Sequence, residues 1–221
     1  MSKLILIRHG QSFYNEKNLF TGWANVDLTP KGVNEANDAA PLLININFTH
    51  AFTSKLIRAQ KTLDIILDKL DQKLEVTENI ALNERDYGSL VGINKKDAAK
   101  KYGSEQVQIW RRSFSTPPPD GESLEMTADR TLPFFKKSIK KLLLNDQNNI
   151  IISAHGNSIR AIVMYLHGLS NQEILNTEIG WCEPWMYEFK NGLLKSFKII
   201  PRPNDKSNSN LSTIPTTIAL I

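Results

Sequence analysis

Two of the four histidines in the chain follow short apolar segments that are typical of buried strands. Residues 4–7 (Leu-Ile-Leu-Ile) precede the first, His9, and residues 150–153 (Ile-Ile-Ile-Ser) precede the second, His155. Because ligands of open parallel sheets bind at the carboxyl ends of the strands, we expect both imidazoles at one edge of a sheet. An imidazole can act there as a nucleophile, an acid or a base. Either histidine alone could be a structural residue, but the repeated context favours a functional pair.

Several arginines accompany these histidines. Arg8 adjoins the first of them, and Arg58 falls in the first turn of a helix that we expect Ser54 to cap. A helix N-terminus combined with a guanidinium group is suited to binding phosphate. Arg111 and Arg112 form a second basic pair. Each could be a solvated surface charge, but together with two histidines they favour a pocket for an oxyanion.

One carboxylate, Glu84, lies in the segment 83–88 (Asn-Glu-Arg-Asp-Tyr-Gly), outside any helical or strand periodicity. A loop carboxylate beside histidines can serve as a general acid or base, although an exposed loop glutamate is the alternative interpretation. Gly22, Gly88 and Gly92 stand in loops, where glycine lets the backbone approach a ligand closely. The two histidines lack a third ligand at metal spacing, which argues against a metal site.

Apolar runs and helix signals alternate along the chain. The runs predict parallel strands at 4–7, 50–53, 74–77 and 150–153. Asn191-Gly192 predicts the turn of a hairpin formed by 185–189 and 193–199, which would add antiparallel pairing. This alternation is typical of a three-layer α/β fold, in which helices flank a mostly parallel sheet.

Capping residues and prolines place helices between and after these strands. The predicted helices are 30–45, interrupted at Pro41; one capped by Ser54; 104–112; 123–144, interrupted at Pro133; one capped by Asn157 and closed by Gly168; and a short one with a capping box at Ser170 and Glu173.

The 221 residues correspond to one domain, placed at 1–200, followed by a tail at 201–221 that we expect to be flexible. A hydrophobic fraction of 41% and a charged fraction of 23% exclude collagen-like, coiled-coil and wholly disordered chains. The net charge of +4 suits small anionic substrates and is too low to predict nucleic-acid binding. With one cysteine, no signal peptide and no apolar run of membrane-spanning length, the chain is expected in the cytoplasm.

Several segments together resemble the histidine phosphatase superfamily and, more narrowly, the cofactor-dependent phosphoglycerate mutases. Arg-His-Gly at 8–10 alone is typical of the superfamily. The segments more specific to the mutases are Phe-Thr-Gly-Trp at 20–23, Asn-Glu-Arg at 83–85 and Trp-Arg-Arg at 110–112, and further matches include Gly-Glu-Ser-Leu at 121–124 and Ala-His-Gly-Asn-Ser-Ile-Arg at 154–160. The resemblance covers residues 3–200 and implies a phosphoglycerate mutase-like fold.

The resemblance implies a metal-free interconversion of 2-phosphoglycerate and 3-phosphoglycerate in glycolysis and gluconeogenesis, primed by 2,3-bisphosphoglycerate. His9 would carry the transferred phosphoryl group, and Glu84 would exchange the proton of the substrate hydroxyl. Arg8, Arg58 and His155 would surround the phosphoryl group. Positions that match substrate-binding residues of the family are Asn15, Thr21, Gly22, Tyr87, Lys95, Arg111, Arg112, Gly156 and Asn157. The implied partners are these metabolites and further copies of the chain, as a homodimer or a larger homo-oligomer.

Two segments depart from the resemblance, and two other functions stay open. The loop at 117–122 is shorter than in the longer members, and residues 179–184 replace the usual Thr-Gly-x-Pro turn. A phosphatase of the same superfamily, in which water accepts the phosphoryl group, is the first alternative. A non-catalytic module that binds phosphorylated ligands is the second, but it would be expected to lack His9, Glu84 or His155, and all three are present.

Overall fold

The apolar strands form the middle layer of the molecule. The computed structural model describes residues 1–202 and 212–214. Its sheet has the strand order β3-β2-β4-β1-β5-β6. The strands are β1 (Ser2–Arg8), β2 (His50–Thr53), β3 (Val76–Glu78), β4 (Asn149–Ala154), β5 (Trp185–Lys190) and β6 (Leu193–Ile199). The first four pair in parallel, and the β5–β6 hairpin runs antiparallel beside β1, so the predicted mostly parallel sheet is confirmed.

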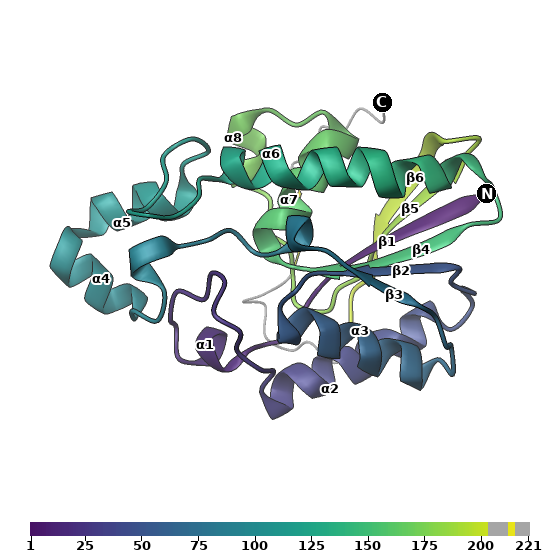
Figure 1. Cartoon of the computed structure of the whole chain (residues 1–221), viewed down its shortest axis with the longest axis horizontal. Coiled ribbons are helices and arrows are strands. Elements are labelled where there is room, and N and C mark those ends of the chain that lie inside the picture. The colour runs from purple at the N-terminus through teal and green to yellow at the C-terminus, as the bar shows by residue number, and fades with distance from the viewer. Residues whose placement is uncertain (203–211, 215–221) are drawn as a thin grey trace.

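Helices cover both faces of this sheet (Figure 1). One face carries α2 and α3, and the other carries α6 and α7. The longer helices are α2 (Pro30–Ala39), α3 (Ile57–Lys69), α4 (Lys95–Tyr102), α5 (Ser104–Arg112), α6 (Leu124–Phe134) and α7 (Gly156–His167), and the short ones are α1 (Phe13–Glu16) and α8 (Asn171–Leu175). The predicted three-layer α/β arrangement is therefore confirmed.

The residues of β1 show why the sheet needs helices on both sides. Successive side chains of a strand point to opposite faces. Leu4 and Leu6 belong to the core that α6 and α7 cover, whereas Ile5 and Ile7 belong to the core that α2 and α3 cover. All four side chains are fully buried. An unbroken apolar run thus produces a strand with two buried faces.

Two predicted helix caps are wrong. The first turn of α3 begins at Ile57 with Leu56 at its N-cap, so Ser54 does not cap this helix. The N-cap residue of α7 is His155, and Asn157 lies in the first turn. Ser54 and His155 instead bond to each other, Oγ to Nε2 at 2.7 Å. This hydrogen bond joins residues that are 101 positions apart, so local capping patterns cannot predict it.

The predicted proline interruptions are confirmed. The helix that begins at Pro30 ends at Ala39, and the 3-10 turn Ala40–Leu43 contains Pro41. Pro133 lies at the end of α6, after which the chain continues as a π-helical segment (Phe135–Ile139) and a 3-10 segment (Lys140–Leu144). Proline lacks the N–H group that the α-helical ladder requires, which explains both changes of geometry.

Two helices, α1 and α4, are absent from the sequence prediction. The sequence of α4 is rich in lysine and buries one residue, Ala98, so it has no apolar stripe to detect. Together with α5, this helix projects beyond the carboxyl ends of the parallel strands (Figure 1). These two helices therefore form one wall above the sheet edge where a ligand is expected.

Part of the region 201–221 contacts the domain. Arg202 is buried near Glu35, and Thr213 forms an isolated antiparallel bridge with Glu178. The predicted flexibility of the tail otherwise concerns 203–211 and 215–221, which lie outside the described residues. Among residues 1–202 and 212–214, no helix is long and apolar enough to cross a membrane.

Candidate active site

The two histidines meet at the sheet edge, as predicted. They follow β1 and β4, which are neighbouring parallel strands with Arg8 paired to Ala154. The His9 amide donates to the carbonyl of Ala154 at 3.0 Å, and the imidazole centroids of His9 and His155 are 5.0 Å apart. Both rings are almost completely buried. Pairing of two strands that are distant in the chain therefore creates the centre of the site.

The imidazole of His9 is held in one tautomer. Its Nδ1 lies 2.6 Å from the carbonyl oxygen of Gly10, which can only accept, so Nδ1 carries the proton. Nε2 is then the unprotonated nitrogen, and Arg58 Nε donates to it at 3.3 Å. Burial, followed by the charges of Arg58 and Arg8, holds the pKa of His9 well below its usual value. The ring is therefore neutral at physiological pH, the form in which an imidazole can attack an electrophile.

His155 is the second buried imidazole. Its Nε2 bonds to the hydroxyl of Ser54, and its Nδ1 has no hydrogen-bond partner among the described residues. Burial lowers its pKa well below the usual value, and the nearby charges of Arg58 and other groups add to this effect. Because the imidazoles of His9 and His155 are both neutral, they can lie 5.0 Å apart without charge repulsion between them.

Arg58 is fixed between the histidine and a loop. It is fully buried, and its two terminal nitrogens donate to the carbonyls of Ala24 and Gly22, each at 2.9 Å. Gly22 has a φ of +49°, and a Cβ atom there would lie 2.8 Å from the Val91 side chain, so the turn requires glycine. Burial lowers the pKa of Arg58 to about 10, so the group stays cationic at neutral pH.

Arg8 enters the site from the last residue of β1. One of its terminal nitrogens donates to the carbonyl of Ile179 at 2.9 Å, and its guanidinium lies 5.4 Å from the centroid of the Trp181 ring. Gly156 adjoins the space between two opposite charges, because a Cβ atom there would make ordinary van der Waals contact, at 3.8 Å, with both Arg8 and Glu84 Oε2.

Glu84 is a buried carboxylate that lies close to Gly156 and faces the same space as Arg8. Its Oε1 accepts from the Arg85 amide at 2.8 Å and from the Asn157 side chain at 2.9 Å and amide at 3.1 Å. Burial raises the pKa of Glu84, but the Arg85 amide, the charge of Arg8, the Asn157 side chain and the charge of Arg58 together hold it below the usual value. At neutral pH this group is therefore ionised and able to accept a proton.

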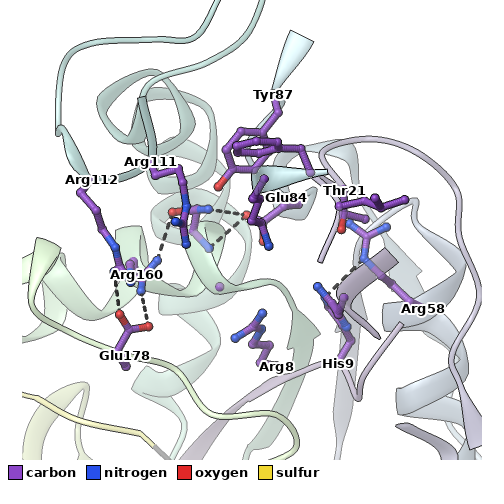
Figure 2. Close-up of a pocket in the computed structure, with 16 residues that line it drawn as sticks. Arg8, His9, Thr21, Arg58, Glu84, Tyr87, Arg111, Arg112, Arg160 and Glu178 are labelled. Carbon is purple, nitrogen blue, oxygen red and sulfur yellow. Dashed lines mark hydrogen bonds and ion pairs between the residues drawn. The ribbon is translucent and has the colours of Figure 1, made fainter. Parts of the chain in front are cut away.

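A polar cavity of about 140 Å³ opens above these groups. Figure 2 shows His9 and Arg58 on one side and Arg111, Arg112 and Arg160 on the other. Twelve of the fourteen predicted site residues line it: Arg8, His9, Asn15, Thr21, Arg58, Glu84, Tyr87, Lys95, Arg111, Arg112, Gly156 and Asn157. The other two, Gly22 and His155, support the lining through Arg58 and His9.

The cavity is strongly cationic. Its charged lining consists of the cations Arg8, Arg58, Lys95, Arg111, Arg112 and Arg160 and the carboxylates Glu84 and Glu178. Burial, followed by the charges of Arg111 and Arg8, lowers the pKa of Lys95 to about 8. Such a lining fits a small molecule that carries several negative charges. No group of three or more His, Cys, Asp or Glu within the described ranges could hold a metal ion.

Arg160 and Glu178 line the cavity but are absent from the sequence prediction. Arg160 follows Gly156 by four residues on α7, so the helical period could have placed it on the same face. Glu178 lies just before the segment 179–184, which departs from the expected pattern, and no motif marks it. Only the folded chain brings it to Arg112 and Arg160.

Similar solved structures share this fold. The alpha-ribazole phosphatase from Shigella flexneri superposes with a TM-score of 0.78 over 90% of this chain and 95% of its own, at 22% identity. A mycobacterial glucosyl-3-phosphoglycerate phosphatase in complex with VO3 gives a TM-score of 0.75 over 89% and 96% of the two chains, at 20% identity.

Sequence relatives are much closer. A protein from Parvibaculum lavamentivorans is 48% identical over 90% of this chain and 97% of its own, and one from Cytophaga hutchinsonii is 46% identical over 92% and 95%. Both are named 2,3-bisphosphoglycerate-dependent phosphoglycerate mutase. Residues 4–195 also match the family described as histidine phosphatase superfamily (branch 1). The chain therefore belongs to the histidine phosphatase superfamily and, within it, to the family of 2,3-bisphosphoglycerate-dependent phosphoglycerate mutases.

Proposed function

We propose that this chain interconverts 2-phosphoglycerate and 3-phosphoglycerate through a phosphohistidine at His9. The observation that carries the proposal is an unprotonated imidazole nitrogen facing a cationic cavity that also holds an ionised carboxylate. Both substrates and the primer 2,3-bisphosphoglycerate are small polyanions, which the cavity fits in charge. Family membership supports this choice of substrate.

At the histidine end of the cavity, Nε2 of His9 forms the N–P bond while the bond from phosphorus to the leaving oxygen breaks. Arg8, Arg58 and His155 are proposed to hold the equatorial oxygens of the phosphoryl group in the transition state. These donors are fixed before the reaction, because Arg58 and Arg8 are anchored to backbone carbonyls. Bound 2,3-bisphosphoglycerate supplies the first phosphoryl group. The chain's own residues supply the nucleophile and the groups that bind the transferred phosphoryl oxygens.

Glu84 is proposed to exchange the proton. When the 2-hydroxyl of 3-phosphoglycerate attacks phospho-His9, the N–P bond breaks and Glu84 accepts the hydroxyl proton. The resulting bisphosphate returns its 3-phosphoryl group to His9, and Glu84 gives the proton back to the freed oxygen. The product is 2-phosphoglycerate, and phospho-His9 is restored, so atoms and charge balance over the cycle.

The far side of the cavity is proposed to decide between sugar acid and water as phosphoryl acceptor. Arg111, Arg112, Lys95 and Tyr87 would bind the carboxylate or the non-reacting phosphate. A substrate held at both ends presents its hydroxyl to phospho-His9 at an effective concentration far above that of a free solute. This arrangement favours transfer to substrate over hydrolysis, which separates a mutase from a phosphatase.

The decisive experiment measures mutase and phosphatase activity together. Purified protein is supplied with 3-phosphoglycerate, with and without 2,3-bisphosphoglycerate, and 2-phosphoglycerate is followed through enolase while released phosphate is assayed in parallel. We expect isomerisation that depends on the primer, persists in EDTA and exceeds hydrolysis. A wild-type enzyme that releases phosphate faster than it isomerises would establish the phosphatase alternative.

Labelling identifies the residue that carries the phosphoryl group. Protein incubated with labelled 2,3-bisphosphoglycerate should acquire an acid-labile, base-stable label, and His9→Asn should lose both label and mutase activity. His50→Asn is the matched control, because His50 lies at the opposite end of β2 from the site. Label retained in His9→Asn would remove His9 from the proposed role.

Location and assembly are also proposed. Burial raises the pKa of the Cys182 thiol, which lies in the interior and has no described disulfide partner, in keeping with a reducing cytoplasmic environment.

A homodimer or larger homo-oligomer is proposed from the family resemblance, and light scattering of the purified chain tests it.

A further inference from the structure

Glu178 places a negative charge in a cavity proposed to bind anions. It lines the same cavity as the arginines, and its side chain is 41% exposed. A carboxylate there repels a phosphorylated substrate by Coulomb interaction. Its presence therefore needs a structural reason that offsets this repulsion.

The two oxygens of Glu178 connect arginines from two different helices. Oε1 accepts from Arg112 of α5 at 2.6 Å, and Oε2 accepts from Arg160 of α7 at 2.8 Å (Figure 2). Burial raises the pKa of Glu178, but the charges of Arg160 and Arg112 hold it below the usual value. One ionised carboxylate thus bridges two guanidinium groups that would otherwise repel each other.

The backbone beside Glu178 holds arginines as well. Arg160 Nε donates to the carbonyl of Thr177 at 2.7 Å, and Arg8 donates to the carbonyl of Ile179 at 2.9 Å. Residues 177–179 thereby contact three arginines of the cavity. Long arginine side chains lose considerable rotamer freedom when fixed, and these bonds fix them before a ligand arrives.

The segment 177–180 is itself held by hydrogen bonds from residues 212 and 213. The amide and carbonyl of Glu178 pair with the carbonyl and amide of Thr213, both at 2.9 Å. The hydroxyl of Ser212 accepts from the Gly180 amide at 2.8 Å and from the Trp185 indole at 2.9 Å. Residues 212 and 213 therefore fix the backbone that carries the bridging carboxylate.

We propose that Glu178 is a positioning residue that orients Arg112 and Arg160 for the anionic group of the substrate farthest from His9. The inference rests on the proposed function, because it assigns these arginines to the substrate's carboxylate or non-reacting phosphate. Glu178 touches no reacting atom. It acts by keeping the two guanidinium groups in place, as preorganised sites require.

Removal of the charge and removal of the bridge have opposite consequences. If Glu178 were only a nearby negative charge, Glu178→Gln would make the cavity more cationic and lower the KM for 3-phosphoglycerate. If it positions the arginines, the same substitution frees them, so KM rises, kcat falls and hydrolysis gains relative to isomerisation. The sign of the change in KM therefore separates the two roles.

The experiment compares Glu178→Gln and Glu178→Ala with Glu75→Gln, which removes a charge from an exposed position on the segment leading into β3. We expect KM for 3-phosphoglycerate to rise roughly tenfold in both Glu178 variants and the mutase-to-phosphatase ratio to fall. Inhibition by vanadate, a small anion that fits the His9 end alone, should stay within about twofold of wild type. Glu75→Gln should match wild type in every readout, and thermal unfolding shows that each variant is folded.

Three results would overturn the proposal: an unchanged or lower KM, a wild-type ratio, or vanadate inhibition weakened in parallel with KM, which would indicate that the whole cavity has collapsed. Failure of the proposed function is seen separately, as a wild-type protein that does not isomerise. In that case calorimetry with 3-phosphoglycerate still tests the positioning role. Weaker binding to Glu178→Gln than to wild type supports it, and equal or tighter binding overturns it.

Discussion

Burial and neighbouring arginines keep His9 in the neutral form that the proposed attack on phosphorus requires. The Nδ1–H group is committed to the Gly10 carbonyl, so the lone pair lies on Nε2. The lowered pKa values of His9 and His155 mean that neither ring takes up a proton in the physiological range. The same arginines that would bind the transferred phosphate thus also keep its acceptor neutral.

A titration by NMR tests this state directly. The ring resonances of His9 and His155, assigned by comparing the wild type with His9→Asn and with His155→Asn, should show no titration between about pH 6 and 8. The physical reason is that protonation would bury a positive charge and add it to the nearby charges of Arg58 and Arg8. A titration midpoint near 6.5 for His9 would contradict it.

Lys95, unlike the two histidines, makes the charge of the cavity depend on pH just above neutrality. Its pKa of about 8 means that it loses its charge as the pH rises through that value. The KM for 3-phosphoglycerate should therefore rise above pH 8, whereas kcat changes less. Lys95→Arg, which keeps the charge, should show a flat KM across this range.

The neighbouring exposed lysine provides the matched control. Lys96→Arg changes the same helix without altering the cavity, so it should keep the wild-type rise in KM. A KM that rises equally in Lys95→Arg would show that another group titrates.

At the scale of elements, the loop after β1 depends on close backbone contact with α2. A Cβ atom on Gly10 would lie 2.3 Å from the carbonyl oxygen of Gly32, and one on Gly32 would lie 2.1 Å from that of Gln11. Because these contacts are with backbone atoms, a side chain at either glycine would force the backbone to shift at a cost in stability. They set the distance between α2 and the loop that carries His9.

Gly32→Ala should therefore both destabilise the protein and lower activity. We expect a loss of about 1–3 kcal/mol in the free energy of unfolding, in the range of overpacked interiors. Chemical denaturation measures this loss, and the exposed neighbour Asn34→Ala is the control that should change stability little. A Gly32→Ala protein with wild-type stability would mean that α2 shifts without cost.

Elements with an apolar pattern are predictable from this sequence, and elements without one are not. The runs at 4–7 and 150–153 predict β1 and β4, and hence the meeting of His9 and His155. Ser54 is mistaken for a helix cap because its hydroxyl serves a histidine from the other half of the chain. Glu178 escapes prediction because its role depends on two arginines that only tertiary structure brings to it.

At the scale of the whole molecule, buried neutral histidines link stability to pH. The pKa values of His9, His155 and His167 are all lowered on folding, the last to about 4. The unfolded chain therefore binds more protons below about pH 6.5, and stability must fall as the pH decreases through that value. Carboxyl groups with lowered pKa, such as Glu84, add their losses only at more acidic pH.

Denaturation at several pH values tests this linkage. At pH 5.5 each histidine with a strongly lowered pKa should cost about 1.2 kcal/mol of unfolding free energy relative to pH 7. The His9→Asn variant lacks the contribution of His9, so its unfolding free energy should fall less steeply between pH 7 and 5.5. A stability that is constant between pH 7 and 5.5 would contradict the burial of neutral imidazoles.

The strand order has a consequence for synthesis on the ribosome. β1 is the first strand to emerge, yet its partners β4 and β5 begin at Asn149 and Trp185. Both edges of β1 therefore stay open until most of the chain has been made, and open edges invite pairing with other chains. A nascent chain that stalls before Asn149 would carry His9 without either neighbouring strand. The proposed phosphoryl-transfer site is thus assembled only at the end of translation, and early termination leaves an aggregation-prone strand in its place.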